Sequence, residues 1–244
     1  MAVREQARQT LDKIVETCRA EGRRQLTEWE TYAILQDWRV PVAPCELVHE
    51  PGEAAEAAVR LGGKVAVKIV SPDIGHKTEA GCVRLNVSGP TEAAAACAEV
   101  LANAYFHAPE ARIDGVLIQQ MAPAGIEVIL GGLHDPSFGP VVMVGLGGIF
   151  TEVLKDVSFR LAPLSEEQAQ AMLQELRGFP LLTGARGKPP VHLQSLRRTL
   201  VAISQLAAAW PDLQELDLNP LIAHEGGVIA VDGLATLKPP TPEV

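Results

Sequence analysis

Apolar and polar residues follow one another with two different periods along the chain. Apolar residues spaced three and four apart predict helices, at residues 4–20, 28–38, 51–61, 91–106, 165–177 and 191–209. Short apolar or alternating runs predict extended segments, at 40–48, 64–70, 82–87, 116–122, 126–133 and 139–148. Helices and strands mixed in this order indicate an α+β or α/β fold.

Cap and turn residues predict where some of these elements begin. Thr27, followed three residues later by Glu30, predicts a capping box at the start of the second helix. Thr91 is predicted to cap the alanine-rich helix that follows it. The segments 116–122 and 126–133 are predicted to be neighbouring strands, because only a short turn containing proline and glycine joins them.

The stretch LDLNPLIA-HEGG-VIAVDGLA, residues 216–235, predicts a hairpin with its turn in HEGG. This register sets Asn219 opposite Asp232 and Asp217 opposite Leu234. Period-two alternation then places Asp217, Asn219 and Asp232 on one face. Two oxygen ligands at cross-strand distance suit one hard cation such as Mg²⁺. The alternative is a solvated polar face on an edge hairpin.

The stretch KIVSPDIGHKTEAG, residues 68–81, passes from an apolar strand into a polar loop. Lys68 lies within the strand, and a buried lysine needs an anionic partner because an unpaired buried charge is costly. In the loop, Ser71 and Lys77 supply polar and cationic groups, and glycines expose backbone N–H groups to an anion. His76 is suited to act as a nucleophile toward phosphorus or as an acid–base group. The loop therefore predicts a site that handles a phosphoryl group; the alternative is a surface turn with solvated side chains.

Three further features have two interpretations each. In GLGGIFTEVLKD, residues 145–156, glycines after a strand allow a ligand to approach closely, but a tight turn explains them equally well. Glu127 in the strand IEVILGGL is either a ligand of ribose or metal, or a solvent-facing residue. Arg186 in TGARGKPP is either an anion-binding residue or an ordinary loop charge.

Composition narrows the class of protein. The formal net charge of −9 argues against broad nucleic-acid binding, which needs Lys and Arg to displace counterions. The four cysteines form no CxxC pair, so a zinc site is not expected. No apolar run reaches the roughly 18 residues of a membrane span, and the polar start predicts no signal peptide. We therefore expect a soluble cytoplasmic protein with reduced thiols and no membrane partner.

Several stretches together resemble one family. They are VAVKIVSPDIGHKTEAGCV, GIEVILGGLHDPSFGPVVMVGLGGIFTEVLKDVSFRLAPL, LLTGARGKPPV and LQELDLNPLIA. Over nearly its whole length, about residues 5–237, the chain is similar to the nucleotide-binding β subunit of ADP-forming acyl-CoA synthetases. This is the acetate–CoA ligase group, an ATP-grasp family related to succinyl-CoA synthetase.

The resemblance implies an ATP-grasp fold, in which two α+β subdomains hold the nucleotide between them. Residues 1–39 would form an N-terminal helical segment of this domain, 40–121 the smaller subdomain and 122–237 the larger, with a tail at 238–244. The resemblance also implies ATP or ADP and Mg²⁺ as ligands, and a CoA-binding α subunit as partner in a hetero-oligomer. The implied reaction converts acyl-CoA, ADP and phosphate to acid, ATP and CoA, or runs in reverse.

The family pattern further implies which residues bind the nucleotide. By matching position, Lys68 would contact the nucleotide phosphates, with Ser71 following in the loop. Glu127 would lie near the ribose or the triphosphate. A hinge beside the adenine would be formed by Gln119, Gln120 and Met121.

The same pattern implies which residues carry the phosphoryl transfer. His76 matches a family histidine that takes the phosphoryl group and passes it between the nucleotide and a phosphohistidine of the α subunit. Asn219 and Asp232 would hold Mg²⁺, in agreement with the predicted hairpin register.

Two positions depart from the family pattern. The family usually has Arg two residues after the metal-binding Asp, where this chain has Leu234, so a cation near the transferred phosphate is lost. Lys77 and Arg186 are the expected replacements for that cation. Cys82 stands where the family usually has a second glycine, which would stiffen the loop.

Two alternative functions therefore stay open beside the synthetase. Leu234 favours a non-catalytic module that binds nucleotide or only a partner. The other alternative is an ATP-grasp ligase that forms an acyl phosphate directly and needs no phosphohistidine.

Overall fold

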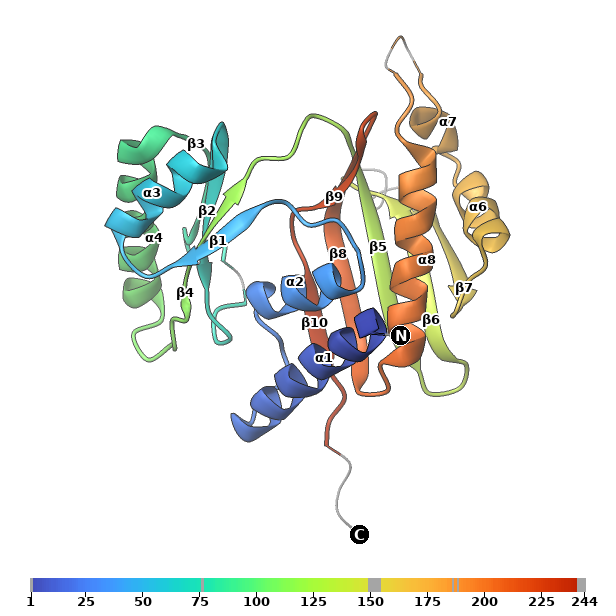
Figure 1. Ribbon diagram of the computed structural model, residues 1–244, viewed down its shortest axis with the longest axis horizontal. Coiled ribbons are helices and arrows are strands. Elements are labelled where there is room, and N and C mark those ends of the chain that lie inside the picture. Colours follow the sequence, from blue (N-terminus) through green and yellow to red (C-terminus); the bar gives the residue numbers. More distant parts are fainter. Residues whose placement is uncertain (1, 76, 149–154, 186, 188, 241–244) are drawn as a thin grey trace. The chain divides into compact units, whose positions relative to one another are not determined.

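The structure is a computed structural model that describes residues 2–75, 77–148, 155–185, 187 and 189–240. The chain divides into two compact units, whose elements Figure 1 labels. Unit 1 comprises residues 1–42 and 123–244, and unit 2 comprises residues 43–122. Unit 2 thus begins three residues later and ends one residue later than the smaller subdomain expected at 40–121. The N-terminal helices belong to the same unit as the residues after 122.

Unit 2 is an antiparallel sheet with two helices on one face (Figure 1). Its strands follow the order β1-β4-β2-β3, with β1 at Cys45–Val48, β4 at Gly115–Gln120, β2 at Lys64–Val70 and β3 at Val83–Ser88. The helices are α3, Pro51–Leu61, and α4, Gly89–His107. Their buried alanines share one core with Val65, Val67 and Ile69 of β2. Because strand residues alternate, Lys68 lies on the opposite face of this sheet.

Unit 1 is built on a larger antiparallel sheet of order β10-β8-β5-β6-β7, with β9 paired to β8. Its strands are β5 (Ile126–Asp135), β6 (Gly139–Leu146), β7 (Val157–Leu161), β8 (Leu213–His224), β9 (Gly227–Ala230) and β10 (Leu234–Leu237). Its helices are α1 (Ala2–Ala20), α2 (Glu28–Asp37), α6 (Glu166–Glu175), α7 (Phe179–Leu182) and α8 (Leu193–Ala209).

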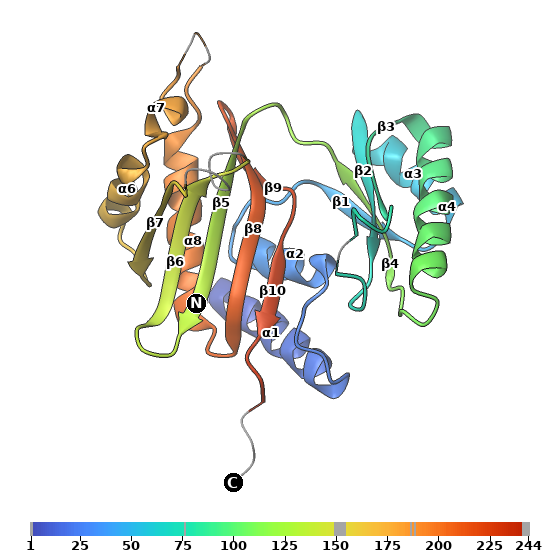
Figure 2. The ribbon, with the colours of Figure 1, turned by 180° about the vertical axis from the view of Figure 1, so that it is seen from behind.

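Helix α8 covers one face of the unit 1 sheet by packing on β5 and β6. On that face Val128 and Leu130 of β5 and Val142 and Val144 of β6 are completely buried. Figure 2 views this sheet from its other face, with α8 behind the strands. No described helix in either unit is long and apolar enough to cross a membrane.

Of the two predicted helix starts, one is confirmed and the other is wrong. At α2, the Thr27 N–H donates to Glu30 Oε2 at 2.8 Å, and the Glu30 N–H donates to Thr27 Oγ1 at 3.3 Å, so the predicted capping box is confirmed. The prediction for Thr91 is wrong, because α4 begins at Gly89 with Ser88 as its N-cap. Pro90 explains the earlier start, since proline is favoured in the first helical turn, where its missing N–H costs nothing.

Two strand predictions also need correction. Strands β4 and β5 are not neighbours: they belong to different sheets, and the chain passes from unit 2 to unit 1 between them. A short proline-containing connection suits a crossing between units as well as it suits a hairpin. The second strand of the predicted hairpin is divided into β9 and β10, because residues 231–233 leave the strand conformation. Strand β7 has only five residues, and the hydrophobic pattern does not predict it.

Candidate functional site

Unit 2 carries two buried polar side chains on the sheet face opposite α3 and α4. Lys68 pairs with Leu117 of β4 and Val83 of β3, and only 7% of its surface is exposed. Gln119 lies diagonally across from Lys68 on the same face and is 2% exposed. The prediction of a buried lysine within this strand is thus confirmed.

The loop after β2 is anchored where it begins. Ser71 is buried, and its Oγ accepts the Asp73 N–H at 3.1 Å. Asp73 Oδ2 accepts the Arg112 N–H at 2.8 Å, which ties the loop to the segment before β4. Ile74 is also buried and belongs to the unit 2 core. These contacts fix the first residues of the loop, immediately beyond Lys68.

The loop is anchored again where it ends. The Cys82 N–H donates to the Lys77 carbonyl at 2.8 Å, and the Asn103 side chain donates to the Gly81 carbonyl at 2.8 Å. Gly81 has φ +65°, and a Cβ there would lie 3.0 Å from Asn103 Nδ2, so this position requires glycine. Cys82 is fully buried in the core, and burial raises the pKa of its thiol. The departure from the glycine pair therefore fills the core of unit 2.

Between these anchors the loop is open to solvent. Gly75 and Thr78 are exposed, and Lys77 is half-buried. His76 lies outside the described residues, as does Arg186 in the connection between α7 and α8. Gly75 and Thr78 thus face solvent between two fixed ends of the loop.

The expected hinge residues have different surroundings. Gln119 is buried in the sheet, whereas the Gln120 side chain donates to the carbonyl of Leu61 at the end of α3, at 2.8 Å. The Met121 N–H donates to the Lys64 carbonyl at 2.9 Å, after which the chain leaves unit 2. Gln120 thus has a structural hydrogen bond of its own.

In unit 1, two glycines of the GLGG motif lie against Glu127. Glu127 is exposed on β5, and its carbonyl accepts the Gly147 N–H at 2.7 Å. A Cβ on Gly147 would lie 2.8 Å from Glu127 Cβ, and one on Gly148 would lie 3.6 Å from Glu127 Oε2. Glycine is thus needed at 147 so that the backbone passes close to this glutamate. Residues 149–154 of the motif lie outside the described residues.

The predicted register of the β8 hairpin is confirmed. Leu221 pairs with Ala230 in β9, and Asp217 pairs with Leu234 in β10. Asn219 and Asp232 therefore lie opposite one another in the gap between these paired segments, and both are exposed. At Asn219 the pairing of β8 with β5 shifts by one residue. Such a bulge re-aims a side chain.

The hairpin gathers oxygen atoms on one side of unit 1. The Asp232 Oδ1 accepts the Gly233 N–H at 2.9 Å, which orients this carboxylate. Asp217 is half-buried, and burial, followed by the nearby charges of Glu215 and Asp232, raises the pKa of its carboxyl. An amide oxygen and carboxylates are the donors that Mg²⁺ accepts, with water and phosphate oxygens as further ligands. The residues present therefore fit that cation.

Comparison with known proteins decides the family. A family model described as an ATP-grasp domain matches residues 17–237. The chain is 43% identical to the β subunit of acetate–CoA ligase (ADP-forming) I of Pyrococcus furiosus, over 90% of this chain and 94% of that subunit. It is 39% identical to acetate–CoA ligase (ADP-forming) I of Archaeoglobus fulgidus, but spans only 33% of that protein.

The chain belongs to the ATP-grasp family of ADP-forming acetate–CoA ligases. Its fold is also similar to that of acetyl-coenzyme A synthetase 1 of Ca. Korarchaeum cryptofilum, solved in complex with coenzyme A and Ca-AMPCP. The TM-score is 0.89 at 38% identity, covering 93% of this chain and 99% of that one. A second structure of the same enzyme, with a phosphorylated phosphohistidine segment, has a TM-score of 0.85 at 36% identity, with the same coverage.

The departure from the family pattern at Leu234 changes the surroundings of the Asp217 carboxylate. It is 42% exposed and lies directly across the strand pair from Asp217. An arginine at this position, as in the family pattern, would place a guanidinium beside the Asp217 carboxylate. Here that carboxylate has an apolar neighbour and two nearby negative charges instead.

Sequence reasoning missed Asp156, the last residue of the GLGG motif. Its carboxylate is buried and accepts the N–H groups of Arg177 and Gly178, at 2.7 and 2.8 Å. Gly178 in turn packs so closely on Leu146 that a Cβ would lie 2.1 Å from Leu146 Cδ1. Asp156 therefore fastens the segment after α6 to β6, next to Gly147. A carboxylate bound by backbone N–H groups far along the chain has no sequence pattern that reveals it.

Proposed function

We infer that the chain is the nucleotide-binding subunit of an ADP-forming acyl-CoA synthetase. With a CoA-binding subunit, it interconverts acyl-CoA, ADP and phosphate with acid, ATP and CoA. The observation that carries this inference is the buried Lys68, which lies three residues before a loop that is anchored at both ends, with Gly75 and Thr78 exposed between the anchors; His76 belongs to the sequence of this loop. The compact ammonium of a lysine at the start of such a loop suits a phosphoryl group as a point charge.

The phosphoryl transfer takes place at His76. In the direction of ATP synthesis, the P–N bond of the phosphohistidine breaks while an oxygen of the ADP β-phosphate forms the new P–O bond. Lys68 and Ser71 bind the nucleotide phosphates, and Lys77 and Arg186 offset charge on the transferred group. This protein therefore positions the nucleotide phosphates and neutralises charge on the transferred group, while His76 relays the phosphoryl group.

Unit 1 supplies the groups for Mg²⁺ and for the ribose or the triphosphate, whereas the hinge beside the adenine belongs to unit 2. Asn219 and Asp232 would hold Mg²⁺, which when bound would neutralise charge on the phosphate oxygens. Glu127 contacts the ribose or the triphosphate, supported by its exposure next to Gly147 and Gly148. Beside the adenine, the hinge consists of Gln119, Gln120 and Met121. We assign units 2 and 1 to the smaller and larger ATP-grasp subdomains.

A separate CoA-binding subunit completes the enzyme as a hetero-oligomer. The Pyrococcus furiosus relative of similar length is named a β subunit, and the Archaeoglobus fulgidus relative, about three times as long, is one chain. The test is to mix this chain with its cognate α subunit and follow ATP formation from acetyl-CoA, ADP and phosphate. ATP formation that requires both subunits and Mg²⁺ supports the proposal, and its absence from every mixture contradicts it.

Leu234 supports a second candidate, a subunit that binds nucleotide without transferring phosphate. In that case Mg-ADP raises the melting temperature of the chain, because a ligand that binds only the folded state stabilises it. ATP formation in the two-subunit mixture is then absent, and Leu234→Arg restores it.

A further inference from the structure

Two rows of side chains cross the open face of the unit 1 sheet, the face away from α8 (Figure 2). Cross-strand pairing from β7 to β8 aligns the first row, which consists of Leu161, Val141, Leu133 and Glu215. It aligns the second row likewise, which consists of Phe159, Met143, Gly131 and Asp217. We call these eight residues the open sheet face.

Large apolar side chains of the open sheet face are exposed to solvent. Leu161, Phe159 and Leu133 are 57%, 48% and 37% exposed. On the opposite face of the same sheet, Val142 and Val144 are completely buried under α8. A sheet with one covered face normally places polar residues on the other. Apolar residues there indicate a surface that is covered in the working protein.

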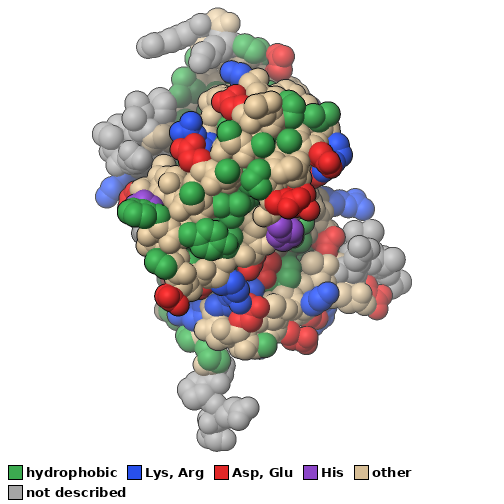
Figure 3. Space-filling model, turned by 90° about the vertical axis from the view of Figure 1, so that its left-hand side faces the viewer, with side chains coloured by type: hydrophobic (Ala, Val, Ile, Leu, Met, Phe, Trp, Pro, Cys, Tyr) green, Lys and Arg blue, Asp and Glu red, His purple; other side chains and the backbone are tan. Residues whose placement is uncertain are grey.

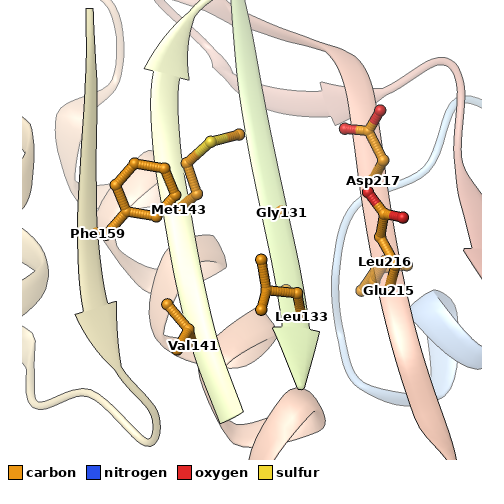
Figure 4. Close-up of a pocket in the computed structure, with 9 residues that line it drawn as sticks. Gly131, Leu133, Val141, Met143, Phe159, Glu215, Leu216 and Asp217 are labelled. Atoms are coloured by element: carbon orange, nitrogen blue, oxygen red, sulfur yellow. The ribbon is translucent and has the colours of Figure 1, made fainter. Parts of the chain in front are cut away.

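Gly131 creates a hollow in the middle of the second row. Figure 4 shows Phe159 and Met143 on one side of Gly131 and Asp217 on the other. These residues, together with Leu133 and Glu215, line a pocket on the sheet. A Cβ on Gly131 would lie 3.4 Å from its nearest neighbour, the Leu216 carbonyl, and 3.6 Å from Met143 Cε. The hollow thus has room for an incoming side chain.

The edge of the hollow on β8 is acidic. Glu215 is exposed and Asp217 half-buried, on the same face of β8. The negative charges of Glu215 and Asp232 act on Asp217. Arg160, the cation of β7, pairs with Val142 on the opposite face of the sheet and bonds to Glu175 of α6. Among the residues that the structure describes, no ion pair joins Glu215 or Asp217 to a cationic side chain.

The charge pattern distinguishes the open sheet face from a second exposed apolar surface, on unit 2. On unit 2, Val59, Tyr105 and Phe106 are exposed on α3 and α4. Figure 3 looks at the side that carries these helices and shows hydrophobic side chains among charged ones of both signs. That surface has no preferred charge in a partner, whereas the open sheet face favours a cation.

We propose that the open sheet face docks a segment of the CoA-binding partner subunit, with an apolar side chain in the hollow over Gly131 and a Lys or Arg against Glu215 and Asp217. This proposal rests on the proposed function. A second copy of this chain fits poorly, because its own open sheet face carries no cation to set against Glu215 and Asp217. An apolar anchor with a desolvated charge pair is typical of the energetic centre of an interface.

Two variants and a matched control test the docking in the whole protein. The dissociation constant for the purified cognate α subunit is measured by titration calorimetry for wild type, Glu215→Lys, Gly131→Val and Glu225→Lys. Glu225 is exposed in the β8–β9 turn, so the control makes the same charge change elsewhere on unit 1. Glu215→Lys and Gly131→Val are expected to raise Kd at least about tenfold, as for central interface residues, and Glu225→Lys less than about twofold. The Mg-ADP melting shift of each chain alone confirms that it is folded and binds nucleotide.

The outcomes separate the docking from the proposed function. If both variants bind the α subunit as wild type does, while the mixture forms ATP, the docking is wrong and the function stands. If wild-type chain self-associates and Gly131→Val abolishes this, a second copy occupies the face and the docking is wrong. If wild type binds Mg-ADP but no α subunit, both the docking and the two-subunit function fail.

Discussion

Replacing Leu234 with arginine should stabilise the protein through Asp217. Leu234 lies directly across the strand pair from Asp217 and is 42% exposed, so the longer side chain has room and little apolar burial is lost. In the wild type, burial and the charges of Glu215 and Asp232 raise the pKa of Asp217 above its ordinary value of 3.8. A guanidinium opposite the carboxylate favours the ionised form and lowers this pKa.

The size and pH dependence of the effect follow from this geometry. Opposite charges directly across an antiparallel pair contribute about 0.2–1 kcal/mol. A raised pKa means that the carboxyl of Asp217 opposes folding at neutral pH, and that this penalty disappears as the pH falls through the folded-state pKa to below 3.8. The gain from Leu234→Arg is therefore present at neutral pH and disappears once Asp217 is protonated.

Urea denaturation at neutral and at acidic pH measures this gain. Leu234→Gln is the matched control for the loss of an apolar side chain without a new charge. The same Leu234→Arg change in an Asp217→Asn background completes a double-mutant cycle. An equal stabilisation with and without the Asp217 carboxylate would refute the reasoning, because the gain would then not depend on that charge.

Three further changes probe other parts of the protein. Lys68→Met should leave the fold intact but abolish the stabilisation by Mg-ADP, which for wild type is about 2.7 kcal/mol at a hundredfold excess over Kd; an unchanged melting shift would remove Lys68 from the nucleotide site. Asp156→Asn should lower the free energy of unfolding by about 1–3 kcal/mol in urea, because one buried N–H loses its acceptor; no change would mean that water replaces the carboxylate. Gly81→Ala should lower it by about 1 kcal/mol, because φ is +65° and Asn103 is 3.0 Å away; wild-type stability would show that the loop relaxes freely.

The β8 hairpin shows what a sequence pattern can predict and what it cannot. A tight turn in HEGG fixes which residues pair, so the facing of Asn219 and Asp232 follows from the sequence alone. The division of the second strand into β9 and β10 does not follow from the sequence. It arises where Gly233 packs against Thr31 and Tyr32 of α2, since a Cβ there would lie 3.3 Å from the Thr31 side chain. Contacts between distant segments of this kind leave no local pattern.

Other features escape prediction for related reasons. Thr91 has the chemistry of a cap, but Pro90 starts the helix earlier. The short connection between β4 and β5 resembles a hairpin turn, and only the formation of two separate cores sends these strands to different sheets. Asp156 binds backbone N–H groups 21 and 22 residues away, so side-chain spacing says nothing about it. Residue type and period identify chemistry and local structure, whereas tertiary partners decide the rest.

Transfer of a labelled phosphoryl group to this chain tests the central claim most directly. The chain and its cognate α subunit are incubated with Mg²⁺ and ATP labelled at the γ-phosphate, and the label on each subunit is measured after acid and base treatment. His76→Ala is compared with His49→Ala, which removes an exposed histidine outside the loop. The account predicts acid-labile, base-stable label on wild type and His49→Ala, and none on His76→Ala. Label that persists on this chain in His76→Ala would contradict it.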